Sequence, residues 1–176
     1  DTSNISMLEN ASNSLPSIVY HGNKVHLEAS RDTLVRALQR LSKERQFIFT
    51  PIYNIKKLGI WKRFLPRGVN IRHIQWEPET YLSHIAQSDI GVVPNFLPTG
   101  PKLLNYWGHK IVENSKIGVR TNINRKDYLN RYKFTSNSGR LYEFALLAKP
   151  VVAEPTLSIS QDIVHNKDGF LVLTEE

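Results

Sequence analysis

A chain of 176 residues is long enough to bury the core of one domain and hardly long enough for two. It contains no cysteine, which excludes disulfides, thiolate metal sites and a cysteine nucleophile. Its net charge of +7 favours acidic partners such as nucleotide phosphates, nucleic acid or anionic lipid, although a basic surface that is merely solvated explains the same charge.

The ends of the chain and its apolar runs bear on its organisation. No apolar run approaches the ~20 residues that span a bilayer, and no leader of the secretory type opens the chain, so we expect neither a transmembrane helix nor a signal peptide. A start at Asp1, with Met7 as the only methionine, is typical of a domain cut from a longer protein. Residues 1–17 are rich in Ser and Asn and predict a linker or N-terminal arm, which leaves residues 18–176 as the domain.

The first half of the domain alternates short apolar runs with amphipathic stretches. Residues 18–20 predict a buried strand that ends in a turn at His21-Gly22-Asn23. A helical stripe of apolar residues follows at Leu34, Val35, Leu38 and Leu41. Residues 47–52 predict a second strand. Residues 70–76 predict a third, less buried strand, because polar residues separate its two isoleucines.

The same alternation continues to the end of the chain with one long interruption. Residues 81–86 predict a short helix, and residues 89–94 predict a strand that is covered on both faces. Residues 95–133 show no clear secondary-structure pattern apart from a helical stretch at 103–107. Such a long irregular segment is usually functional or mobile. The remaining predicted elements are a helix over 138–148, a strand over 150–153, a helix over 158–165 that buries Ile159, Ile163 and Val164, and a strand over 170–173.

Alternation of short Val- and Ile-rich strands with helices predicts an α/β fold. We expect a Rossmann-like, doubly wound sheet of about six parallel strands with helices on both faces. The expected strand order is 3-2-1-4-5-6. In such a sheet ligands bind beyond the carboxyl ends of the strands, so the loops at that edge are the candidates for a site.

The best anion site in the sequence is the segment that opens the helix at 138. Ser, Asn and Gly leave backbone N–H groups free to approach a ligand, and nearby cations add positive charge where the helix dipole favours an anion. The candidate residues are Lys133, Asn137, Ser138, Gly139 and Arg140. Glu143, one turn along, is placed to accept hydrogen bonds from ribose hydroxyls. An ordinary N-cap and a dipole-favoured glutamate explain the same residues without a ligand.

Four segments together resemble the donor-binding half of the group 1 retaining glycosyltransferases of the GT-B fold. The main block is Ser138-Gly139-Arg140-Leu141-Tyr142-Glu143-Phe144-Ala145-Leu146-Leu147-Ala148-Lys149-Pro150-Val151-Val152-Ala153. Asp162-Ile163-Val164 and Asp168-Gly169-Phe170-Leu171-Val172 are similar to the closing segment of that family. Ser88-Asp89-Ile90-Gly91-Val92-Val93-Pro94 and Tyr20-His21-Gly22-Asn23 are similar to two of its strands.

The resemblance implies a domain that binds a nucleoside-diphosphate sugar, here a substrate rather than a cofactor. It implies that Glu143 binds the donor ribose and that residues 137–139 contact the pyrophosphate. It also implies that Trp76 and Glu77 contact the nucleobase. An ordinary half-buried aromatic at a strand end explains Trp76 equally well.

The acceptor, a sugar or a lipid-linked glycan, belongs to an N-terminal half, and so does any catalytic base on the acceptor side. This piece alone should therefore bind nucleotide and catalyse no transfer. The resemblance further implies transfer with retention by a cytoplasmic protein, and it allows peripheral association of the full-length protein with the inner face of the membrane.

The chain departs from the family's pattern at three positions. Thr135 stands where the family has a glutamate poised over the sugar. Asn23 and Glu28 stand where it has an arginine and a lysine that grip phosphate. Lys24, Lys133 or Arg140 could replace these cations, because only positive charge within reach of the phosphates is required.

Other functions are less well supported by the residues. The six histidines have no paired spacing that indicates a metal site, and His21 and His26, beside the first turn, are either ligand contacts or ordinary polar residues. A non-catalytic scaffold that has lost its phosphate grip, with 95–133 as a protein-binding surface, is the alternative function. Nucleic acid is not expected as a partner, because the basic residues are not interleaved with aromatics on one element.

Overall fold

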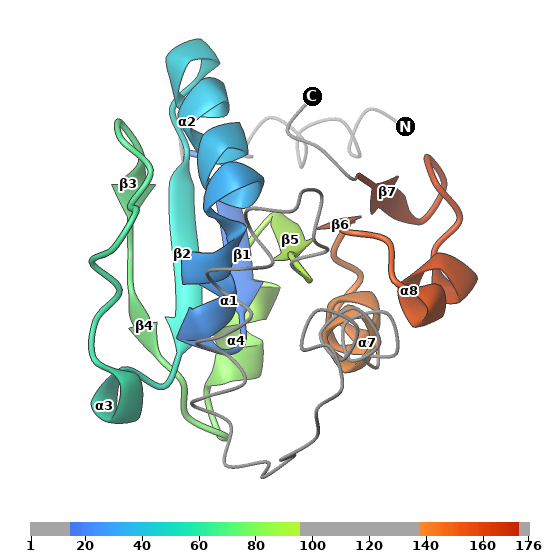
Figure 1. Cartoon of the computed structure of the whole chain (residues 1–176). Coiled ribbons are helices and arrows are strands. Elements are labelled where there is room, and N and C mark those ends of the chain that lie inside the picture. The colour runs from blue at the N-terminus through green and yellow to red at the C-terminus, as the bar shows by residue number, and fades with distance from the viewer. Residues whose placement is uncertain (1–14, 96–137, 173–176) are drawn as a thin grey trace, which may run out of the picture.

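The computed structural model describes residues 15–95 and 138–172, and they form one twisted sheet between two layers of helices (Figure 1). The irregular stretch predicted at 95–133, its helical segment at 103–107, and the positions Lys133, Thr135 and Asn137 lie outside the described residues, apart from Asn95. No helix in the described ranges is both long and apolar enough to cross a membrane.

All strands of the sheet run parallel, and their order confirms the expected Rossmann-like topology. The order is β3-β2-β1-β5-β6-β7, with β4 also paired to β2. The strands are β1 (Ser17–His21), β2 (Ile48–Tyr53), β3 (Asn70–Ile71), β4 (Ile74–Gln75), β5 (Ile90–Val93), β6 (Val151–Ala153) and β7 (Gly169–Leu171). Because β3 and β4 follow one another along β2, they together make the third strand of the predicted 3-2-1-4-5-6 order.

The third strand is interrupted where the sequence predicted a continuous one. Arg72 and His73 separate β3 from β4, although the Arg72 N–H still donates to the Phe49 carbonyl at 2.9 Å. Ile71 and Ile74 are only half-buried, as the polar residues around them suggested. This strand lies at the edge of the sheet, where a break costs few ladder hydrogen bonds.

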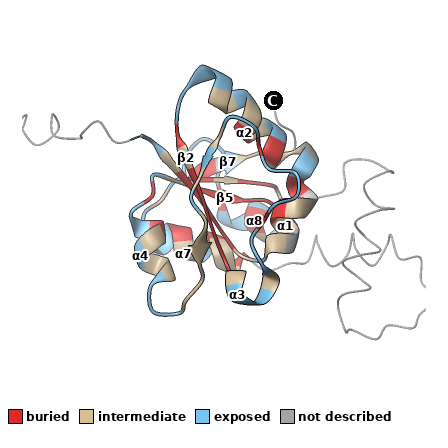
Figure 2. Ribbon diagram, turned by 90° about the vertical axis from the view of Figure 1, so that its left-hand side faces the viewer, coloured by how far each residue is buried: buried red, intermediate tan, exposed pale blue. Residues whose placement is uncertain are grey.

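Helices cover the two faces of the sheet as right-handed crossovers require. One face packs against α1 (Lys24–Ala29) and α2 (Leu34–Glu44), and the other against α4 (Tyr81–Ala86), α7 (Gly139–Leu146) and α8 (Leu157–Asp162). A 3-10 turn, η1 (Ser30–Asp32), links α1 to α2, and the short helix α3 (Ile55–Leu58) follows β2. Figure 2 shows the buried residues concentrated along the strands between these layers.

Each face has its own apolar core. Tyr20, Phe49 and the buried Trp61 pack under α1 and α2, whereas Val19 and Phe144 lie on the α7 face. The alternation of inward and outward side chains along β1 thus fills both cores, as the apolar run at 18–20 predicted. The expected helix over 158–165 ends at Asp162, and Val164 is 57% exposed, so its predicted burial was wrong. Ile163 is extended, with φ −113° and ψ 127°, and this turns the next side chain outward.

Candidate functional site

The turn after β1 lies at the edge where the parallel strands end (Figure 1). Gly22 has φ 144°, and its N–H donates to the Ile52 carbonyl at 3.0 Å. A Cβ on Gly22 would lie 2.7 Å from Tyr20 Oη, which itself donates to the Asn23 carbonyl at 2.7 Å. Both the backbone conformation and the lack of space require glycine here, so the turn brings bare backbone to the sheet edge.

The start of α7 brings a second piece of bare backbone to the site. The N–H groups of Gly139 and Arg140 have no acceptor among the described residues, as expected for the first turn of a helix. Ser138 is buried, and its hydroxyl donates to Asp162 Oδ2 at 2.6 Å instead of capping the helix. Only the backbone of Ser138 is therefore placed to meet a ligand.

Arg140 reaches from α7 across the ends of β5 and β1. Its Nη2 donates to Asn95 Oδ1 at 2.8 Å and its Nη1 to the Pro94 carbonyl at 3.4 Å. Its Cδ lies 3.5 Å from where a Cβ of Gly22 would be. The guanidinium stem therefore passes directly over the glycine turn.

A buried carboxylate holds the asparagine that contacts Arg140. Glu154, just after β6, accepts from the Asn95 N–H at 2.9 Å through Oε2 and from Thr33 Oγ1 at 3.1 Å through Oε1. The Asn95 amide in turn donates to the Glu154 carbonyl at 3.2 Å. The ends of β5 and β6 and the start of α2 are thereby tied together, and the network aims Asn95 Oδ1 at Arg140.

Glu143 lies one turn after Arg140 and faces the end of β1. Its Oε1 accepts from Tyr81 Oη at 3.2 Å, and its Oε2 is in contact with His21 Nε2. The two contacting atoms are buried, and neither has a hydrogen bond with any residue that the structure describes. Buried polar groups without partners are rare and call for an explanation.

Burial sets the protonation of this pair. Burial raises the pKa of Glu143 above its ordinary value, and the Tyr81 hydrogen bond and the Arg140 charge offset part of that rise. Burial also lowers the pKa of His21 to about 4, with the Arg140 charge adding to the effect. His21 is therefore neutral at pH 7, and one of its two ring nitrogens carries a proton that can be donated.

An open hollow adjoins this pair. Its volume is about 340 Å³, and its lining residues are His21, Gly22, Asn23, Asn54, Lys57, Leu58 and Trp76. Trp76 follows β4, and its ring centroid lies 5.7 Å from that of Tyr81, the residue bonded to Glu143. The hollow thus combines an aromatic wall, a lysine and the glycine turn, and Glu143 touches its His21 wall.

The structure brings some of the predicted site residues together and not others. Gly22, Asn23 and Trp76 line the hollow. Glu143 contacts His21, another of its lining residues, and Arg140 passes close to Gly22. Lys24 Nζ donates to the Leu58 and Gly59 carbonyls and so closes the end of α3. Glu77 pairs with Lys56 at 2.7 Å on the surface, which is an ion pair of small energetic weight.

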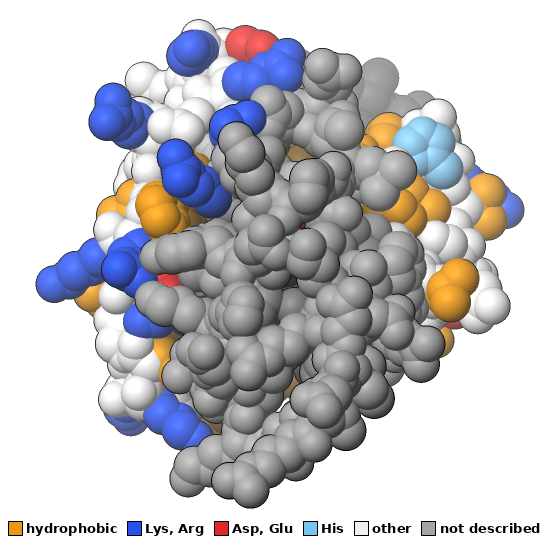
Figure 3. All heavy atoms as spheres, in the orientation of Figure 1, with side chains coloured by type: hydrophobic (Ala, Val, Ile, Leu, Met, Phe, Trp, Pro, Cys, Tyr) orange, Lys and Arg blue, Asp and Glu red, His pale blue; other side chains and the backbone are white. Residues whose placement is uncertain are grey.

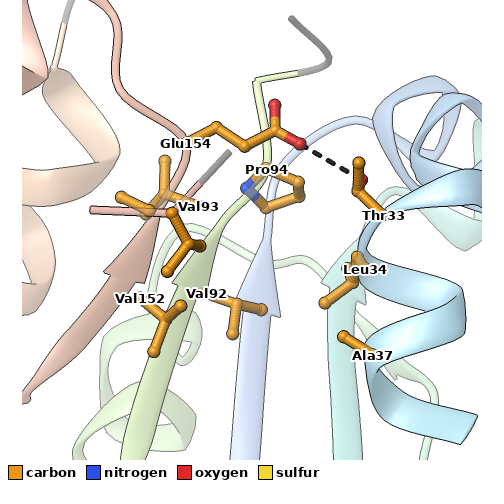
Figure 4. Close-up of a pocket in the computed structure, with 10 residues that line it drawn as sticks. Thr33, Leu34, Ala37, Val92, Val93, Pro94, Val152 and Glu154 are labelled. Carbon is orange, nitrogen blue, oxygen red and sulfur yellow. Dashed lines mark hydrogen bonds between the residues drawn. The ribbon is translucent and has the colours of Figure 1, made fainter. Parts of the chain in front are cut away.

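A second hollow, between α2 and the ends of β5 and β6, is small and almost wholly apolar (Figure 4). Its volume is about 70 Å³, and Leu34, Ala37, Val92 and Val152 are among the apolar residues that line it. The Glu154 carboxylate closes one end through its bond to Thr33. Such a space suits packing and not a charged ligand.

Sequence reasoning missed the residues that organise the site. Asn95 and Glu154 follow the fourth and fifth predicted strands, so the rule that ligand sites lie beyond strand ends could have selected them. Nothing in the sequence marked Tyr81 as a site residue, because its position fits the apolar, core-facing side of the predicted helix at 81–86. His21 was left open between a ligand contact and a surface residue, and its 8% exposed side chain excludes the surface alternative.

The buried neutral His21 predicts acid destabilisation. Its pKa is about 4 in the folded protein against about 6.5 unfolded, so the unfolded chain binds more protons between these values. Stability is therefore lost as the pH falls through that window, by about 2 kcal/mol between pH 7 and pH 5. The raised pKa of Glu143 acts in the opposite direction, because the folded state takes up that proton first.

Urea denaturation of the wild type and of His21→Gln, at both pH values, measures this contribution. We expect the variant to lose about 2 kcal/mol less between pH 7 and pH 5, because glutamine does not titrate. Equal losses in the two proteins would show that His21 is solvated or charged in the folded state.

No group of three or more His, Asp or Glu residues in the described ranges could hold a metal ion. Neither a scan of protein-family models nor searches of curated proteins and of solved structures give a match for this chain. The fold is Rossmann-like, and the candidate site rests on geometry alone.

Proposed function

We propose that this domain binds a nucleoside-diphosphate sugar at the carboxyl edge of its sheet, as the donor half of a retaining glycosyltransferase. The observation that carries the proposal is the buried pair of His21 Nε2 and Glu143 Oε2, which contact each other without the geometry of a hydrogen bond and have no hydrogen-bond partner among the described residues. A polar ligand group at this point would satisfy both atoms.

A ribose fits the chemistry of that pair. One hydroxyl can donate to the Glu143 carboxylate while it accepts from the Nε2–H of neutral His21. Tyr81 donates to the second carboxylate oxygen at 3.2 Å, so the carboxylate has a set orientation. Hydrogen bonds to a charged acceptor are worth about 1.5–3 kcal/mol, enough to anchor a sugar ring.

The diphosphate would lie between the glycine turn and the start of α7. The N–H groups of Gly139 and Arg140 provide donors at the positive end of the helix dipole. The Arg140 side chain already passes Gly22 with its Cδ, and its guanidinium can exchange its contacts with Asn95 and Pro94 for phosphate oxygens. Arg140 would thereby replace the cations whose usual positions hold Asn23 and Glu28.

The nucleobase would lie against Trp76, which lines the hollow. During transfer, the same donors would stabilise the diphosphate as it departs from the sugar. The acceptor and any acceptor-side base would belong to a second half. We therefore expect the chain by itself to bind nucleotide without turnover.

Calorimetric titration with uridine, guanosine and adenosine diphosphates tests the proposal. For the nucleotide that binds, Glu143→Gln should weaken affinity about 10-fold or more, because the charged acceptor is lost. The 2′,3′-dideoxy form of the same nucleotide should bind wild type and variant alike, since it lacks the hydroxyls that Glu143 would hold. Glu44→Gln, an exposed change at the end of α2, is the matched control.

The alternative is a scaffold that has lost its phosphate grip. Asn23 and Glu28 provide no cation, and Lys24 is engaged with the end of α3, which favours this alternative. A thermal-shift screen separates the two functions, because a ligand that binds the folded state raises the melting temperature. No shift with any of the three diphosphates at millimolar concentration would support the scaffold and reject donor binding.

A further inference from the structure

The loop between α3 and β3, residues 59–69, displays large apolar side chains on the surface. Ile60 is 44% exposed, and Phe64 and Leu65 are each 38% exposed. The loop is nevertheless firmly held, because Trp61 is buried in the core and its backbone N–H donates to Tyr53 Oη at 2.8 Å. An anchored loop that keeps three large apolar groups in water marks a candidate interaction surface.

The surroundings of this loop are strongly basic. Residues 55–72 contain six Lys or Arg and no Asp or Glu, namely Lys56, Lys57, Lys62, Arg63, Arg67 and Arg72. The adjoining stretch 30–45 contributes five further basic residues, namely Arg31, Arg36, Arg40, Lys43 and Arg45. It contains only two acidic residues, Asp32 and Glu44. Figure 3 shows Lys and Arg side chains gathered over α2 and the side that carries α3, with hydrophobic side chains between them.

A hollow joins the apolar and the basic groups. It lies between α2 and the loop, has a volume of about 400 Å³, and is lined by Arg31, Val35, Arg36, Gln39, Phe64, Leu65 and Arg67. No carboxylate is among these lining residues. The Arg31 guanidinium stacks on the Phe64 ring at 4.8 Å from its centroid. Phe64 itself has φ 56°, an uncommon backbone conformation for a bulky residue.

We propose that this face, formed by α2 and residues 59–69, docks on an anionic phospholipid bilayer. Exposed apolar side chains ringed by Lys and Arg suit the interface of such a membrane, where apolar groups enter the boundary of headgroups and chains. The cations pair with the negative lipid headgroups, and the arginine-lined hollow receives a headgroup phosphate. A nucleic acid would pair with the cations through its phosphates and would leave the three outward apolar groups in water.

Sedimentation of the whole chain with lipid vesicles tests the proposal. We expect binding to vesicles of mixed phosphatidylcholine and phosphatidylglycerol, weak binding to phosphatidylcholine alone, and a decline between about 0.1 M and about 1 M salt. Phe64→Ser/Leu65→Ser and Arg31→Gln/Arg67→Gln should each lower vesicle affinity about 10-fold or more.

Matched controls separate this face from general stickiness and from loss of folding. Leu146→Ser/Leu157→Ser removes apolar groups that are 78% and 64% exposed on α7 and α8, and it should bind vesicles as the wild type does. Lys149→Gln/Lys167→Gln removes two charges away from the face, with the same expectation. Each variant should keep the wild-type circular dichroism and any nucleotide affinity, so the outcome does not depend on the proposed donor site.

Three results would overturn the proposal. The first is unchanged vesicle binding by Phe64→Ser/Leu65→Ser, and the second is an equal loss in either control pair. The third is duplex or single-stranded nucleic acid bound more tightly than anionic vesicles through the same arginines, which would reassign the face.

Discussion

Gly91→Ala should lower the free energy of unfolding by about 3 kcal/mol, because overpacking a core at a rigid position has a cost of this order. Gly91 is buried in β5, and a Cβ there would lie 2.6, 2.7 and 2.8 Å from three ring atoms of Phe144. The strand cannot move aside, since Gly91 pairs with Val19 on one side and Val151 on the other. The ring of Phe144 and with it α7 must therefore shift.

Urea denaturation of a double-mutant cycle checks the cause. Phe144→Leu alone should cost about 1–2 kcal/mol, since it removes part of a fully buried side chain. In the pair Gly91→Ala/Phe144→Leu the smaller side chain leaves room for the new methyl group. The double variant should then be more stable than the sum of the single losses predicts, by about 1 kcal/mol or more. Additive losses would show that the ring does not set the cost.

The same substitution has a consequence for the site. Phe144 immediately follows Glu143 on α7 and lies 5.7 Å from the ring of His21, centroid to centroid. A displaced α7 would move Glu143 away from His21 and Arg140 away from Gly22. Loss of nucleotide binding by Gly91→Ala, with partial recovery in the double variant, would connect core packing to the proposed donor site.

Arg140→Ala should weaken binding of the nucleoside diphosphate about 30-fold, because a charge-assisted pair with phosphate is worth about 1.5–3 kcal/mol. Arg140 is the described cation that passes over the glycine turn, and Asn95 and Pro94 hold it there. The corresponding nucleoside, which lacks phosphate, should bind the variant and the wild type equally. Calorimetric titration with both ligands measures the difference.

Two further variants define the contribution of Arg140. Arg140→Lys keeps the charge but loses the planar fork, so its affinity should fall between those of the wild type and the alanine variant. Lys149→Ala, a change of charge just beyond the C-terminal end of α7, should leave affinity unchanged. If the nucleoside and the diphosphate weaken equally on Arg140→Ala, the residue supports the fold and does not hold phosphate.

Glu154 lies between the small apolar hollow under α2 and the side chain of Arg140. It is buried, closes the apolar space under α2, and orients Asn95 toward Arg140. A cation that is preorganised in this way loses less side-chain freedom when phosphate binds. This network offers a physical reason why a chain without the family's usual cations could still bind a donor.

Much of the fold was predictable because strand signals are local. The apolar runs at 18–20, 89–94 and 150–153 fell on β1, β5 and β6, and the strand order typical of a doubly wound Rossmann-like fold placed these strands correctly. The helices α1 and α3 were missed, because the apolar residues of α1 lie two apart in the sequence, which is not a helical spacing, and α3 has only four residues. Lys133 and Asn137 remain predictions, because they lie outside the described residues.

The candidate site was predictable only in part. The spacing of Gly139, Arg140 and Glu143 on one helix was visible in the sequence, and so was the glycine after the first strand. The partners of these residues were not, because His21, Tyr81 and Asn95 come from other elements. Separations of 45 to 62 residues along the chain leave no periodic trace for Asn95 and Tyr81.

By itself, then, the sequence determined the alternation of strands and helices, the parallel sheet and the start of α7, because each depends on the chemistry of neighbouring residues. Tertiary structure alone decided that the Glu143 carboxylate meets buried His21, that Arg140 passes over Gly22, and that an anchored loop displays apolar groups among cations. These features depend on which segments the sheet brings together. Burial then changes the chemistry of those residues, as the lowered pKa of His21 shows.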